Sequence, residues 1–195
     1  MPTEVDICNM ALSHIAQYPI QSLNDSLKTA QECKTLYPRA RDSVLEDFMW
    51  NFAFKWIAIP LLDLEHDKWT YLYQYPSDCV RALEIYNSAS ETDKIEFEIY
   101  VNEDLDSKMI GTDQEDAVLK YTARVTNPNL FTSQFIDALS YRLAADLALP
   151  LRGDPKIFDA MLRIYSAYIS RAQMHNANER EKTPSDDNSL VDARD

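Results

Sequence analysis

The sequence predicts a mixed α+β protein. We expect a helical bundle of about four helices, arranged as two hairpins, with a small antiparallel β-sheet inserted between the hairpins and an extended C-terminal tail. Apolar residues recur at helical spacing near both ends of the chain, whereas the middle alternates polar with β-branched or aromatic residues. Residues 181–195 are mostly polar and have no apolar period. The chain is therefore expected to form one domain over residues 1–180, followed by a tail at 181–195 that is disordered when alone in solution.

The first hairpin is predicted from two helical segments, 3–17 and 26–50. Thr3 is placed to cap the first helix, whose apolar positions then follow at helical spacing before Pro19. Asp25 or Ser26 is placed to cap the second helix. Pro38 lies inside this second helix, so we expect a kink or a break just before it.

The inserted sheet is expected over residues 54–126, where the apolar period shifts toward two. Strand-like segments occur at 55–59, 70–75, 79–86, 95–101, 107–111 and 117–125. The whole chain has only two glycines, so the turns between these strands are expected to use Asn and Asp. The same scarcity excludes Gly-rich phosphate-binding loops.

The second hairpin is predicted at 131–149 and 155–178. Pro150 is expected to end the first of these helices, and Gly153 to supply a flexible joint. Asp154 is a ready N-cap with Pro155 at the first helical position, where its missing N–H costs nothing. The residues expected to pack this hairpin, or to form an interface on it, are Phe131, Phe135, Leu139, Leu143, Leu147, Phe158 and Tyr165.

The net charge is −13, and the acidic excess is concentrated between Glu84 and Asp116. A protein that grips nucleic acid needs clustered Lys and Arg, so stable DNA binding is not expected. The simplest interpretation of the acidic segment is a solvated surface. A sharper alternative is a wall of like charge that lets DNA slide past without sticking.

No motif for a cofactor, a metal or a catalytic residue is recognisable in the chain. The three cysteines and three histidines are widely separated, so the thiols are interpreted as buried groups in a reducing compartment. Asp63, Glu65 and Asp67 would share one face of an extended strand, but they lack the glycine and the closing Glu of a calcium loop, so a solvated loop is favoured over an ion site. No membrane span and no secretion signal are expected.

An aromatic cluster in the sheet segment leaves two interpretations open. Its members are Trp56, Trp69, Tyr71, Tyr73 and Tyr75. Such residues can stack on a carbohydrate or a base, but few basic residues surround them, which favours a sheet core or a subunit interface.

Several stretches, in this order, resemble the head-to-tail adaptor proteins of short-tailed bacteriophages, also called tail tubular protein A or tail accessory factor. The resemblance spans most of residues 5 to 180, although a glycine and a proline that are common in the family are replaced near Ala16 and at Met49. The stretches that carry it are Ile7–Ser13, Ile20–Asp25, Cys33–Asp42, Trp50–Ala53, Tyr73–Arg81 and Phe135–Asp154.

This resemblance implies a structural virion protein without enzymatic activity or cofactor, assembled in the host cytoplasm and located at the connector. It implies a ring of twelve copies that binds the portal protein, carries distal nozzle or fibre proteins, and extends the DNA channel for genome retention and ejection. Family members can reach the portal with an extended C-terminal segment. The residues of this chain that the resemblance assigns to portal docking are Lys182, Pro184, Leu190, Val191 and Arg194.

Two other functions stay open at the level of the sequence. A hydrolytic, cell-wall-degrading tail component would need two carboxylates in one cleft, which an acidic chain offers in many combinations. A DNA-packaging factor is disfavoured by the deficit of basic residues.

Overall fold

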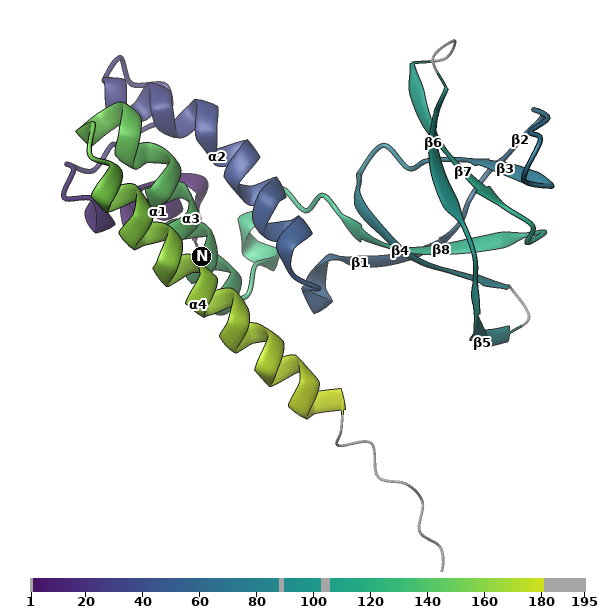
Figure 1. The fold of residues 1–195 in the computed structure, drawn as a ribbon. Coiled ribbons are helices and arrows are strands. Elements are labelled where there is room, and N and C mark those ends of the chain that lie inside the picture. Colours follow the sequence, from purple (N-terminus) through teal and green to yellow (C-terminus); the bar gives the residue numbers. More distant parts are fainter. Residues whose placement is uncertain (1, 88–89, 103–105, 181–195) are drawn as a thin grey trace, which may run out of the picture.

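The computed structural model describes residues 2–87, 90–102 and 106–180. Within these residues the chain forms four α-helices and two four-stranded antiparallel sheets, so the predicted mixed α+β class is confirmed. Figure 1 shows the helices gathered in one lobe and both sheets in the other. The expected tail, 181–195, lies outside the described residues. The helices are α1 (Glu4–His14), α2 (Lys28–Asp47), α3 (Ser133–Arg152) and α4 (Pro155–Arg180).

The insertion between α2 and α3 forms two sheets, where the sequence predicts one. The first sheet has the order β1 (Phe54–Ala58), β8 (Ala117–Ala123), β4 (Cys79–Asn87) and β5 (Ser90–Ile95). The second has the order β2 (Leu61–Leu62), β3 (Tyr71–Gln74), β7 (Ser107–Thr112) and β6 (Glu98–Asn102). Alternation locates β1, β3, β4, β7 and β8, but it misses β2 and most of β5, and it does not say which strand pairs with which.

The single strand predicted over 95–101 is wrong, because the chain changes sheets within it. β5 ends at Ile95 in the first sheet, and β6 begins at Glu98 in the second. At the crossing, the hydroxyl of Thr112 donates to the backbone carbonyl of Glu96 at 2.8 Å. Glu96 lies between β5 and β6, so its carbonyl has no partner within either sheet, and this bond supplies one.

The sheet lobe has a core of its own between the two sheets. Leu119 and Ile85 from the first sheet and Ile110 and Tyr73 from the second are buried in one cluster. In Figure 1, β6 crosses in front of β4 and β8. The inner face of each sheet is therefore covered by the other sheet, and not by a helix.

The helical lobe is organised around α3, which contacts α1, α2 and α4. A group of aromatic rings in edge-to-face contact lies at the end of the helical core nearest the sheets. The ring centre of Phe135 is 5.1 Å from the ring centre of Trp50 and 5.1 Å from that of Phe52. Such pairs add specific geometry to the burial of a large apolar area. No helix among the described residues is long and apolar enough to cross a membrane.

The N-terminal caps of α1 and α4 form as predicted. Thr3 and Asp6 form a reciprocal capping box at the start of α1. The carboxylate of Asp154 accepts from the backbone N–H of Lys156 at 2.9 Å, with Pro155 at the first helical position of α4.

The predicted caps of α2 are wrong. The carboxylate of Asp25 accepts from the backbone N–H groups of Gln21 and Ser22, so it closes the preceding turn. α2 begins only at Lys28, without a side-chain cap. It ends at Asp47, where the indole of Trp50 donates to the carbonyl of Val44 at 2.8 Å and so supplies one of the donors that a helix end lacks.

Neither internal proline breaks its helix. α2 runs without interruption through Pro38, and α3 continues past Pro150 to Arg152. The ammonium of Lys28 donates to the carbonyl of Pro150 at 2.6 Å, and Gly153 closes α3 in a left-handed conformation with its N–H on the carbonyl of Leu149. These contacts give partners to two carbonyls of the last turn of α3, which have no donor further along the helix.

The two lobes are joined at the C-terminal half of α2. The carboxylate of Asp42 accepts from Arg124, just after β8, at 2.8 Å, and from the buried guanidinium of Arg41. Arg81 on β4 donates to the carbonyl of Glu46. The sheet lobe is therefore attached to the helices through these polar contacts and through Val80 of β4, which packs against the helical core. Each lobe otherwise keeps a core of its own.

Candidate interaction surfaces

The residues predicted to pack the second hairpin lie in the core of the helical lobe. Phe131, Phe135, Leu139, Leu143, Leu147 and Tyr165 are buried, and Phe158 is partly buried against them. They stabilise this chain itself. An interface on the hairpin must therefore use other side chains, which lie on the outward face of α4.

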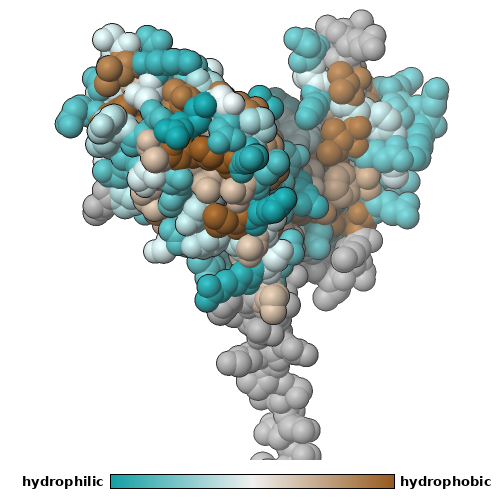
Figure 2. Space-filling model, turned by 60° about the vertical axis from the view of Figure 1, so that its left-hand side comes forward, coloured by the Kyte–Doolittle hydropathy of each residue, from teal (hydrophilic) through white to brown (hydrophobic). Residues whose placement is uncertain are grey.

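A shallow groove of about 360 Å³ runs along the outward face of α4. We call it the α4 groove. Its lining residues recur at helical spacing and are apolar between two exposed arginines: Arg163, Ile164, Ala167, Tyr168 and Arg171. Figure 2 shows hydrophobic residues interrupting the hydrophilic surface of the helical lobe.

The floor of the α4 groove is held by a stack of rings that reaches α1. Tyr168 stacks on Tyr141 of α3 at 5.3 Å, and Tyr141 stacks on His14 at 4.0 Å. The ring of His14 is fixed by Ser140, whose hydroxyl lies 3.1 Å from its Nε2. Burial lowers the pKa of His14, and the nearby charge of Asp137 opposes this effect. The groove is thus backed by a packed imidazole whose pKa lies below its ordinary value.

A second pocket, of about 460 Å³, lies at the far tip of the sheet lobe. We call it the sheet-tip pocket. β1 leaves the helical lobe and ends there, and β8 begins there, as Figure 1 shows. Its wall combines the exposed carboxylates of Glu115 and Asp116 with Leu61, Tyr71 and Tyr73. Such a wall suits a partner that carries both cationic and apolar groups.

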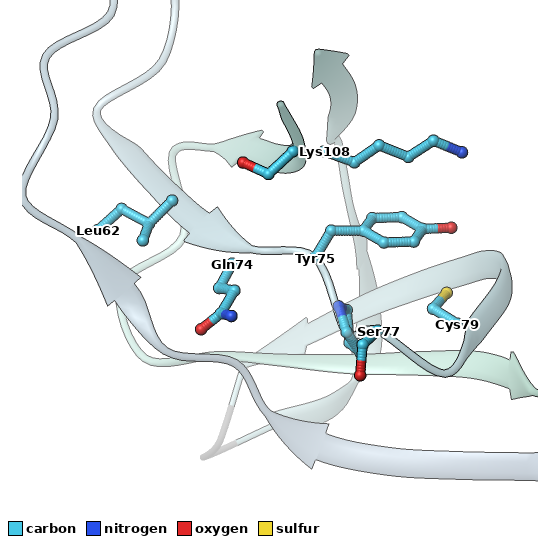
Figure 3. Close-up of a pocket in the computed structure, with 8 residues that line it drawn as sticks. Leu62, Gln74, Tyr75, Ser77, Cys79 and Lys108 are labelled. Carbon is cyan, nitrogen blue, oxygen red and sulfur yellow. The ribbon is translucent and has the colours of Figure 1, made fainter. Parts of the chain in front are cut away.

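The third pocket, of about 580 Å³, is formed by the stretch that carries the central part of the family resemblance. Figure 3 shows Tyr75, Ser77 and Cys79 on one side of it, with Leu62 and Gln74 on the other. The ammonium of Lys108 lies 5.4 Å from the centre of the Tyr75 ring. Burial raises the pKa of the Cys79 thiol, so this thiol is not an activated nucleophile.

The aromatic cluster predicted in the sheet segment is divided among several surroundings. Tyr73 is buried between the sheets, and Trp69 packs on the outer side of the second sheet, where its indole donates to the hydroxyl of Tyr100. Trp56 is 57% exposed on the edge strand β1, with the ammonium of Lys120 5.6 Å from its ring centre. The sequence does not reveal this exposed cation–π pair, because the two residues meet only through the β1–β8 register.

The metal-capable residues are not brought together. Asp63, Glu65 and Asp67 are exposed in an irregular segment, and no cluster of three or more His, Cys, Asp or Glu among the described residues could hold a metal ion. Cys8, Cys33 and Cys79 are buried free thiols, as predicted.

Part of the acidic segment is neutralised by lysines on neighbouring strands. Lys120 pairs with Glu84 at 3.0 Å, and Lys68 pairs with Glu98. Glu98 also accepts from the hydroxyl of Tyr100. These carboxylates order the outer faces of the two sheets, whereas Glu115 and Asp116 form no ion pair with any described residue. Glu96, Asp106 and Asp113 also form no ion pair with any described residue, so Glu115 and Asp116 are distinguished by their position at the sheet-tip pocket.

The predicted portal-docking residues, from Lys182 to Arg194, lie outside the described residues.

Comparison with models of known protein families and with curated proteins found no match to this chain.

Proposed function

We propose that this chain is a structural adaptor of a short-tailed phage, which forms a ring of twelve copies between the portal and the tail. In this proposal the ring extends the DNA channel, and DNA passes through it without specific binding. The four helices act as one bundle that presents the α4 groove to neighbouring molecules, and the chain has no catalytic role. The C-terminal residues 181–195 dock on the portal, and the tail nozzle or fibre proteins bind below.

The observation that carries the proposal is the role of the stretches that resemble the adaptor family. Each of them fixes a junction of the scaffold. Asn9, in the first stretch, exchanges two hydrogen bonds with the backbone of Ile20, in the second, at 2.8 and 3.0 Å. Trp50 ends α2 and packs on Phe135. The stretches therefore hold a shape, which is what a structural family requires of its shared residues.

A further junction lies in the central stretch. The carboxylate of Asp78 accepts from Tyr121 at 2.9 Å and from Lys55 at 2.5 Å, so one side chain connects the turn before β4 with β8 and β1. The backbone carbonyl of Asp78 also accepts from Arg124, beside the joint between the lobes. A rigid joint is useful to a ring subunit, because a small error in its shape would accumulate around the ring.

The experiment that tests the proposal is co-sedimentation of the full chain with the portal protein from the same genome. The adaptor function predicts that the chain joins the portal particle at about one copy per portal subunit. The hydrolase alternative is tested in parallel by adding the chain to purified cell wall. Its candidate carboxylates are Glu115 and Asp116, which share the sheet-tip pocket, so Glu115→Gln and Asp116→Asn would abolish any such activity.

A further inference from the structure

We propose that copies of this chain bind one another head to tail, with the sheet-tip pocket of one copy seated on the α4 groove of the next. This inference rests on the proposed ring and deepens it, because it names the two surfaces that meet. The occupant of each surface is thus a second copy of the same chain.

The first support is charge complementarity. Arg163 and Arg171 lie on the rim of the α4 groove, and neither forms an ion pair with any described residue. Glu115 and Asp116 line the sheet-tip pocket and are also without such a pair. In a chain with a net charge of −13, two arginines flanking an apolar floor are a local exception. Opposite potentials of this kind fix the register of an interface and disfavour other partners.

The second support is the apolar part of both surfaces. Leu61 is 59% exposed at the sheet tip, beside the half-buried ring of Tyr71. The α4 groove offers Ile164, which is 37% exposed, with Ala167 and Tyr168. Along the helix axis the two arginines are about 12 Å apart, at 1.5 Å per residue. That span leaves room for the side chain of Leu61 between the two arginines, with the adjacent carboxylates of Glu115 and Asp116 in the same pocket wall.

The third support is the placement of the two surfaces. The sheet-tip pocket lies at the end of the sheet lobe that is remote from the helices, and the α4 groove lies on the helical lobe (Figure 1). Because the two surfaces differ and lie on different lobes, the contact between copies is heterologous. Such a contact repeats from copy to copy, and it closes into a ring where the rotation per copy allows. Each contact between copies can be weak and the closed ring still be stable, because every copy in the ring is held by two neighbours at once.

Charge reversal on each side, followed by reversal on both, tests the proposal. Sedimentation velocity of the full chain at about 0.15 M salt, where the Debye length is about 8 Å, measures self-association from micromolar to millimolar concentration. Glu115→Lys with Asp116→Lys is expected to weaken self-association by about 100-fold, and Arg163→Glu with Arg171→Glu to weaken it equally, because like charges then face each other. The variant that carries all four changes restores opposite charges and is expected to associate again.

Matched controls separate a local contact from a general effect of charge. Glu65→Lys with Asp67→Lys changes the net charge by the same amount in the exposed segment before β3. Arg39→Glu with Arg152→Glu does so on exposed positions of the helical lobe. Both control pairs are expected to leave self-association within about twofold of the unmodified chain, since charges far from an interface are screened.

Three results would overturn the inference: an unmodified chain that stays monomeric throughout, a reversal on one side that has no effect, or four changes that fail to restore association. These results are distinguishable from a failure of the proposed function. Portal co-sedimentation by the unmodified chain without self-association rejects the contact and keeps the adaptor. Self-association without portal binding rejects the adaptor function and keeps the contact between copies.

Discussion

The indole of Trp69 lies over Gly111, in the space that a side chain at position 111 would need. A Cβ atom added to Gly111 would collide with Cδ1 of Trp69 and lie 2.9 Å from its Cγ. The indole is held there by its hydrogen bond to the hydroxyl of Tyr100, at 2.8 Å. Gly111 is thus required by close packing, whereas Gly153, with a φ of 63°, is required by its backbone conformation.

Gly111→Ala is therefore expected to destabilise the protein by about 1–3 kcal/mol, the usual cost of overpacking. Urea unfolding followed by tryptophan fluorescence measures this change. Gly153→Ala is the comparison, because nothing lies within 4 Å of its added Cβ and only the left-handed backbone costs about 1 kcal/mol. A Gly111→Ala variant as stable as the unmodified chain would show that Trp69 does not occupy this position.

The contact between Tyr165 and Asp47 fastens α4 to the end of α2. The hydroxyl of Tyr165 is buried and donates to the carboxylate of Asp47 at 2.6 Å. Tyr165→Phe is expected to lower the free energy of unfolding by about 1.5–3 kcal/mol, as for other hydrogen bonds to charged groups. Tyr18→Phe, at an almost fully exposed ring, is the matched control and is expected to change nothing measurable. Equal stability of the two variants would contradict the assignment.

His14 gives the helical lobe a dependence on pH. Burial lowers its pKa below the ordinary value of 6.5, so the unfolded chain takes up the proton more readily than the folded chain. Stability is therefore complete above about pH 7 and falls as the pH drops through 6.5 toward the folded pKa. Thermal unfolding between pH 7.5 and about pH 5.5 measures this loss, which His14→Gln is expected to reduce.

Asp137→Asn sharpens the same test. The charge of Asp137 raises the pKa of His14 and so partly offsets the effect of burial. Removing that charge is expected to lower the folded pKa further and to steepen the loss of stability at low pH. A variant with a shallower dependence than the unmodified chain would contradict the role given to His14.

Asp42 holds the joint between the two lobes. The guanidinium of Arg41 is buried and pairs with this carboxylate at 2.8 Å, and Arg124 pairs with it from the sheet lobe. Asp42→Ala leaves a buried cation without its partner, which is expected to cost about 2–4 kcal/mol. Arg124→Ala removes only a half-exposed partner and is expected to cost less than about 1 kcal/mol. Chemical denaturation compares them, and equal losses would contradict this account.

The sequence predicts those features of the fold that depend on local chemistry. The capping box of Thr3, the start of α4 at Asp154 and Pro155, and the burial of the three cysteines follow from residue type and spacing. The features that depend on tertiary contacts are missed. α3 continues past Pro150, and Lys28, distant in sequence, donates to the carbonyl of this proline. The carboxylate of Asp25 accepts from the backbone of the preceding turn and so does not cap α2.

The candidate surfaces are predicted less well than the fold. Periodicity identifies the apolar face of the second hairpin, but that face is buried in the core of the helical lobe. The α4 groove lies on the opposite side of α4. The sheet-tip pocket requires the knowledge that β1 and β8 are neighbours, which no local pattern contains. Charge spacing along α4, from Arg163 to Arg171, was the one signal in the sequence that indicates the groove.

The central proposal, a portal-bound adaptor, is tested most directly by co-sedimentation of two forms of the chain with the portal protein of the same genome. The full chain is compared with a chain truncated after Arg180, which keeps every described helix and strand. The proposal predicts that the full chain joins the portal at about one copy per portal subunit and that the truncated chain does not. Absence of both forms from the portal fraction would contradict the adaptor function, and equal binding of both would contradict the docking role of residues 181–195.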